Sequence, residues 1–308
     1  MEDLQKNILK TFVWFDLFEY PLKLEEIFYY LVSETRHSVL EIEKNIQELL
    51  EKQKIHKKDD FYFLHEREKI VYTRQERYTE SLKKIKKARI AVHFLKNLPF
   101  IRAVFLCNVL GYFNAKKEDD IDFLIITEKN KIWTARWFAT GFFKILNLRP
   151  KKNKIKDKFC FSFYLSEDGL NLEKIKLQDD PYLKYWFACL LPLYDNKNCL
   201  QDFLDSNLWA FKNMFYYKKI YEDKERMSFK FSLQSELVKN FLEKVFGFNL
   251  VESFFKKVQL AIMPKILRCQ MNKSDGVVIS NKILKMHVKD KRREFAEKFN
   301  SRVKNGHK

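Results

Sequence analysis

Two carboxylates, two residues apart at the start of an apolar run, are the side chains of this sequence best suited to chemistry. Asp120 and Asp122 lead into Phe123-Leu124-Ile125-Ile126, a run typical of a buried β-strand. Side chains two apart on a strand share a face, so the two carboxylates lie together. Paired carboxylates repel each other unless a cation lies between them, and hard oxygen ligands favour Mg²⁺ or Mn²⁺. The pattern predicts a divalent metal site, with a solvated acidic turn as the alternative.

The neighbouring segments predict the elements that must position these carboxylates. Residues 101–107 and 121–127 are apolar runs that indicate two buried strands, separated by a short irregular or helical piece. Residues 131–146 predict an aromatic-rich helix, and residues 159–165 predict a third strand. We therefore expect an α+β fold in which a small mixed sheet is flanked by helices.

This order of strand, turn, short helix and Asp-x-Asp strand resembles the polymerase-beta-like nucleotidyltransferase superfamily. The wider chain is similar to a bacterial group of such domains with an N-terminal winged-helix-like domain, through Trp133-Thr134-Ala135-Arg136, the strand at 157–166 and Pro192-Leu193-Tyr194-Asp195. The resemblance implies that Asp120 and Asp122 hold Mg²⁺ or Mn²⁺. The metal would bridge a nucleoside triphosphate and the attacking hydroxyl during transfer of a nucleotidyl group to an acceptor that the sequence does not name.

The resemblance also implies candidate nucleotide contacts. The Gly-Ser turn that binds the triphosphate in that superfamily falls, by spacing, on Asn108 and Val109 of this chain. Asn108, with nearby backbone N–H groups, is the candidate phosphate contact, whereas the β-branched Val109 has no hydroxyl and resists positive φ. Arg136 is a further candidate phosphate contact, or else an ordinary arginine on a helix surface.

Active relatives carry a further carboxylate on a neighbouring strand, which completes the metal site and can act as base. The strand at 159–165 has no carboxylate in its interior, where Ser162 is the polar candidate. The acidic residues that could substitute flank this strand or lie further along the chain: Asp157, Glu167, Asp168 and Asp195. A second hypothesis therefore stays open, in which the chain is a catalytically degenerate scaffold of the same fold that binds nucleotide, RNA or a protein partner.

Charge is distributed unevenly along the 308 residues. The formal net charge is +18, yet residues 1–75 carry 12 Lys and Arg against 15 Asp and Glu, while the remainder carries 47 against 26. Residues 212–308 hold 23 basic and 10 acidic residues, so this part is the better candidate for an acidic partner such as RNA. No apolar run reaches membrane-spanning length, and five scattered cysteines indicate reduced thiols of a cytoplasmic protein.

The N-terminal pattern predicts three helices and a two-stranded hairpin, which is typical of a winged helix. Ser38 and Glu41 have capping-box spacing at the start of the third helix. That helix is acidic and would be repelled by DNA phosphates, so we favour a packing or partner-docking module over DNA recognition. A long, basic-faced helix at 67–98 follows. We expect three parts: a winged-helix-like domain (1–75), a nucleotidyltransferase-like domain (76–215) and a basic helical C-terminal region (216–308).

Overall fold

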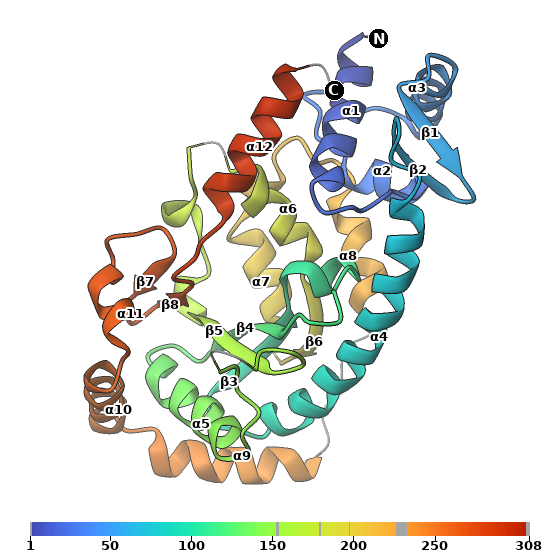
Figure 1. The fold of residues 1–308 in the computed structure, drawn as a ribbon. Helices are drawn as coiled ribbons and strands as arrows, with labels where there is room; N and C mark the ends of the chain where they lie inside the picture. Colours follow the sequence, from blue (N-terminus) through green and yellow to red (C-terminus); the bar gives the residue numbers. More distant parts are fainter. Residues whose placement is uncertain (1, 152–153, 179, 197, 226–232, 306–308) are drawn as a thin grey trace.

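The computed structural model describes residues 2–305 except 152–153, 179, 197 and 226–232. The N-terminal helices and α12 lie above a central sheet in Figure 1, whereas α5, α9 and α10 lie below it. The described elements in chain order are α1 (Glu2–Asp16), α2 (Leu24–Tyr30), α3 (Val39–Glu51), β1 (Ile55–Lys58), β2 (Phe61–Leu64), α4 (Ile70–Leu95), β3 (Ile101–Leu106), the 3₁₀ turn η1 (Asn108–Tyr112), β4 (Ile121–Thr127), α5 (Ile132–Ile145), β5 (Phe159–Ser166), α6 (Pro181–Cys189), β6 (Leu191–Asp195), α7 (Cys199–Asp205), α8 (Tyr217–Glu225), α9 (Leu233–Phe246), α10 (Asn249–Ala261), α11 (Lys265–Gln270), β7 (Val277–Ile279), β8 (Ile283–Met286) and α12 (Arg292–Lys304).

Residues 2–64 form the three helices and the antiparallel hairpin that the sequence predicts. The capping box is present at the start of α3: the Glu41 N–H donates to the Ser38 hydroxyl at 3.2 Å. The Glu41 carboxylate in turn accepts from the Ser38 N–H at 2.7 Å. These two bonds satisfy orphan donors of the first helical turn and fix where α3 begins.

The central sheet has six strands in the order β6-β3-β4-β5-β8-β7, all antiparallel except the β4–β5 pair. The fold is therefore a mixed sheet flanked by helices, as expected from the sequence. Residues 191–195 form the edge strand β6. Pro192 is compatible with that position because an edge strand need not donate every ladder hydrogen bond.

The central strands are buried on both faces, which explains their continuous apolar sequences. In β3, Val104 and Leu106 enter a hydrophobic core with α5, whereas Ala103 and Phe105 face a second core that contains α6 and the N-terminal helices. The same alternation holds in β4. Asp122 has the parity of Leu124, so it belongs to the face that is covered by α6 and the N-terminal helices.

The C-terminal residues pack around this sheet. Glu252 of α10 caps α5 by accepting from the Trp133 and Thr134 N–H groups, both at 2.9 Å. Strand β8 pairs with β5, and α12 packs on α1 and α6, where Arg302 pairs with Asp16 at 2.6 Å. Among the helices described here, none has the length and apolar character needed to cross a membrane.

Candidate metal site and adjoining cleft

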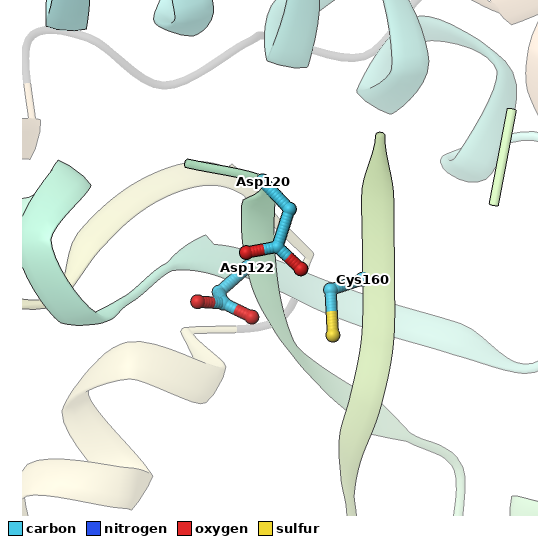
Figure 2. Close-up of side chains that lie close together, drawn as sticks. All are labelled: Asp120, Asp122 and Cys160. Carbon is cyan, nitrogen blue, oxygen red and sulfur yellow. The ribbon is translucent and has the colours of Figure 1, made fainter. Parts of the chain in front are cut away.

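Three side chains that can ligate a metal converge where β4 and β5 begin (Figure 2). The ligand atoms of Asp120, Asp122 and Cys160 all lie within 4.8 Å of one another. Because β4 and β5 run parallel in a register that sets Asp122 opposite Cys160, the thiol comes to the face that carries both carboxylates. The predicted pairing of Asp120 and Asp122 on one face is therefore what the geometry shows.

Burial and mutual repulsion oppose ionisation in this cluster. Burial, followed by the charge of Asp122, raises the pKa of Asp120 from 3.8 to about 7. Burial, helped by both aspartates, raises the pKa of the Cys160 thiol well above its usual value. A divalent cation reverses this balance, because it favours the deprotonated form of every ligand that binds it.

The donor set fits the divalent cations expected from the sequence. Mg²⁺ is commonly held by one or two carboxylates, with water and substrate phosphates in the remaining positions, and Mn²⁺ also suits carboxylate oxygens. Asp120 and Asp122 supply this arrangement. Cys160 adds a soft ligand, which favours transition metals over Mg²⁺. The cluster thus suits Mg²⁺ through its oxygens and a softer cation through all three residues.

Asn108 holds Asp122 in place. Its Nδ2 donates to the Asp122 carboxylate at 2.8 Å, and its Oδ1 accepts from the Trp186 indole N–H at 3.1 Å. The residue adopts φ 56°, a left-handed conformation that asparagine tolerates better than most residues. The expected phosphate contact is therefore, in this structure, an orienting group for a candidate metal ligand.

Val109 and Arg136 are not brought to the carboxylates. The Val109 side chain packs with the apolar core around Val104 and Leu106. Arg136 lies on α5, which covers the opposite face of the sheet, and donates to Gln259 of α10. Burial lowers the pKa of its guanidinium. Arg136 thus joins α5 to α10 and lies apart from the candidate metal ligands.

The four flanking carboxylates are engaged elsewhere. Asp157 accepts from two lysines of α4 at 2.8 and 2.6 Å, and Asp195 accepts from the first two N–H groups of α7 at 2.8 and 2.9 Å. Glu167 accepts from a backbone N–H at 3.3 Å, and Asp168 from a serine hydroxyl at 2.6 Å. Among the described residues, Cys160 is the third side chain within ligand distance of the aspartate pair.

A polar chain leads from Cys160 away from the metal ligands. The thiol donates to the Ser162 hydroxyl at 3.2 Å, and that hydroxyl lies 3.1 Å from Nε2 of His287. A β-bulge permits this alignment, since β5 advances three residues from Cys160 to Phe163 while β4 advances two. Sequence reasoning named Ser162 but missed Cys160 and His287. The alternation of Cys160 and Ser162 with phenylalanines was the available signal, and His287 gave none.

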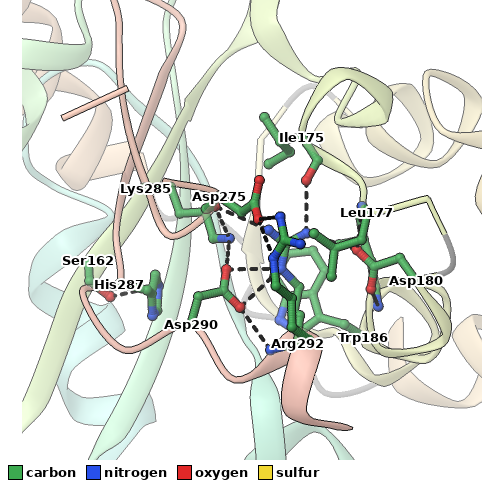
Figure 3. A network of polar contacts seen from close by, with 12 residues as sticks. Ser162, Ile175, Leu177, Asp180, Trp186, Asp275, Lys285, His287, Asp290 and Arg292 are labelled. Carbon is green, nitrogen blue, oxygen red and sulfur yellow. Dashed lines mark hydrogen bonds and ion pairs between the residues drawn. The ribbon is translucent and has the colours of Figure 1, made fainter. Parts of the chain in front are cut away.

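A cleft of about 200 Å³ adjoins the cluster on the side of Asn108 and His287. Helix α6 forms one wall, and the segment that joins β8 to α12 forms the other (Figure 3). The α6 wall carries the aromatic side chains of Tyr182 and Trp186, and the wall after β8 carries the cationic side chains. The lining residues are Asn108, Phe163, Ile175, Tyr182, Leu183, Trp186, Lys285, His287, Lys289, Asp290, Lys291, Arg292 and Phe295.

The chain matches no protein-family model, no curated protein and no solved structure. The two parts of the candidate site are a carboxylate pair with a nearby thiol and a cleft with one cationic wall, and Asn108 connects them because it both bonds Asp122 and lines the cleft.

Proposed function

We propose that this chain binds a nucleoside triphosphate with a divalent cation at Asp120 and Asp122, and transfers a nucleotidyl group to a hydroxyl acceptor. The observation that carries the proposal is the carboxylate pair on one strand face, directly beside a cleft with cationic and aromatic walls. A triphosphate needs both features, because its charge is neutralised jointly by a metal and by basic side chains.

Each residue of the site has a defined task in this proposal. Asp120 and Asp122 bind the cation, and Asn108 keeps the Asp122 carboxylate in its orientation through the bond to Trp186 on its other side. When bound, Mg²⁺ or Mn²⁺ stabilises the charge that develops on the phosphates and aligns them with the attacking oxygen. Transfer also requires removal of the acceptor's proton, and the engaged flanking carboxylates are poorly placed for it.

That last observation favours a second candidate function: binding of the same ligand without transfer. Asp157 and Asp195 are committed to lysines and to a helix N-terminus, so the described residues supply no third carboxylate as base. The chain would then be a scaffold of this fold in which bound nucleotide or RNA, or a protein docked on the acidic N-terminal part, is the functional state.

Calorimetric titration with ATP, GTP, CTP and UTP, with and without Mg²⁺ or Mn²⁺, tests the shared binding step. We expect binding that requires the cation and is lost in the Asp120→Asn, Asp122→Asn variant. A matched control, Glu118→Gln with Asp119→Asn, removes the same charge from the same turn and should bind normally. Metal-independent binding, or binding that survives loss of both aspartates, would contradict the proposal.

Release of pyrophosphate then separates the two candidates. Wild-type chain incubated with labelled triphosphate and a pool of RNA and small hydroxyl acceptors should form a labelled product if it transfers. Binding with no pyrophosphate release above the double variant would identify the scaffold function.

A further inference from the structure

Two lysines on the cationic wall of the cleft are available to a ligand. Lys289 and Lys291 are exposed and line the cleft, and neither forms an ion pair with a residue that the structure describes. The other two cationic side chains of this wall, Lys285 and Arg292, are buried and paired with aspartates. Among the described cationic side chains of this wall, Lys289 and Lys291 are therefore the exposed ones that no aspartate or glutamate engages in an ion pair.

A buried ion network fixes the backbone that carries these lysines (Figure 3). Asp290, between them in sequence, accepts from Lys285 at 2.6 Å and from the Arg292 backbone N–H at 3.0 Å. Arg292 also donates to Asp180 of the α6 N-terminus at 2.9 Å. Asp290 and Arg292, the sequence neighbours of the two lysines, are both anchored by these bonds. The backbone that carries Lys289 and Lys291 is therefore already ordered before a ligand binds, so binding loses little backbone entropy.

A close backbone approach at Gly276 anchors the segment from its other side. The His287 N–H donates to the Gly276 carbonyl at 2.8 Å. A Cβ on Gly276 would lie 2.1 Å from the His287 carbonyl oxygen, so only glycine permits this packing. The turn before β7 and the segment after β8 are therefore joined.

The cleft lies within reach of the candidate metal ligands. From Asp122 on β4 the path crosses β5 at Ser162 and reaches His287 just past β8, which is two strand spacings, or about 10 Å. The opposite wall carries the α6 aromatics Tyr182 and Trp186, and Tyr182 stacks on Phe295 of α12 at 5.6 Å between ring centroids. A ligand with a polyanionic part and a flat apolar part matches these two walls.

We infer that this cleft is a polyphosphate subsite in which Lys289 and Lys291 bind the phosphates remote from the metal. The inference rests on the proposed function, and it moves phosphate binding away from Asn108 and Val109 to the segment that joins β8 to α12. Asn108 is occupied by Asp122 and Trp186, and Val109 is packed in the core, so the turn that carries them offers no free side-chain donor comparable to the two lysines.

The experiment compares Lys289→Ala, Lys291→Ala with a control of equal charge change on the helix that follows, α12: Lys298→Ala, Lys304→Ala. Both pairs are exposed, so both variants should keep the wild-type urea midpoint. The ligands are ATP and AMP with Mg²⁺, and inorganic tripolyphosphate without metal. We expect the first variant to weaken ATP and tripolyphosphate about tenfold, the combined effect of two exposed ion contacts, with AMP changed less than about twofold. The control should bind as wild type does.

The outcomes distinguish this inference from the proposed function. Lysine-dependent binding of tripolyphosphate without Mg²⁺-dependent ATP binding would support the subsite and overturn the proposed function. ATP binding that needs Asp120 and Asp122 but is equal in both lysine variants would overturn the subsite and leave the proposed function standing. Absence of ATP and tripolyphosphate binding by the wild type would overturn both.

Discussion

Replacing Asp120 by asparagine should stabilise the metal-free fold above neutral pH. Burial and the adjacent Asp122 raise the pKa of Asp120 from 3.8 to about 7. The folded chain therefore holds this proton more tightly than the unfolded chain, and folding is increasingly penalised as pH rises from 3.8 to about 7. The penalty is complete above that range and corresponds to about 4 kcal/mol, at 1.36 kcal/mol per pKa unit.

Asparagine keeps the shape of the side chain and carries no charge, so Asp120→Asn removes the penalty. The free energy of unfolding, measured in urea with a chelator present, should rise by about 2–4 kcal/mol at pH 8 and by well under about 1 kcal/mol near pH 4. Glu118→Gln controls for loss of an acidic charge in the same turn and should show no such pH-dependent gain, because Glu118 is exposed and Asp119, which also raises the pKa of Asp120, is kept.

Bound metal should reverse the order of stability of the wild type and Asp120→Asn at pH 8. Saturating Mg²⁺ or Mn²⁺ should stabilise the wild type at pH 8 by binding the folded state, and should leave Asp120→Asn nearly unchanged. If the variant's gain were the same at pH 4 and pH 8, or if it were destabilised at both, the electrostatic account of this carboxylate pair would be refuted.

Three further predictions concern the surroundings of the pair. Cys160→Ser should weaken Cd²⁺ or Zn²⁺ binding at least about tenfold in competition titrations and leave Mg²⁺ affinity within about twofold, because only the soft ligand is lost. Asn108→Ala should lower metal affinity about tenfold by releasing the Asp122 carboxylate; unchanged affinity in a calorimetric titration would show that this hydrogen bond does not orient a ligand. Arg292→Met should cost about 3–5 kcal/mol in urea unfolding because it leaves the buried Asp180 carboxylate without its ion-pair partner, and adding Asp180→Asn should recover much of that loss.

Strand periodicity was sufficient to predict the centre of the site but not its surroundings. The shared face of Asp120 and Asp122 follows from the period of two alone. It holds whichever way β4 faces, because both faces of that strand are buried. The same reasoning searched for a third carboxylate and passed over Cys160, whose position depends on the pairing register between β4 and β5. A parallel register is set by tertiary packing and is not encoded in either strand alone.

The contribution of the C-terminal residues to the sheet and to the cleft was harder to predict, again because it depends on tertiary packing. Strand β8 is four residues long and contains Lys285, so its local pattern does not distinguish a strand from a loop. It forms a strand because β5 offers it an edge, and Lys285 can be buried there because Asp290 compensates its charge. Similarly, His287 meets Ser162 across 125 residues of sequence, a contact that no short-range pattern predicts.

The same C-terminal segment completes both the sheet and the cleft. Without the chain beyond residue 215, β5 would present an unpaired edge rich in phenylalanine, which is the type of strand edge that promotes aggregation. Strand β8 covers that edge, and the segment directly after it carries His287, Lys289 and Lys291 into the cleft. The residues that protect the sheet thus also supply the cationic wall, so a part of the chain ending near residue 215 would have the candidate metal ligands without the proposed polyphosphate subsite.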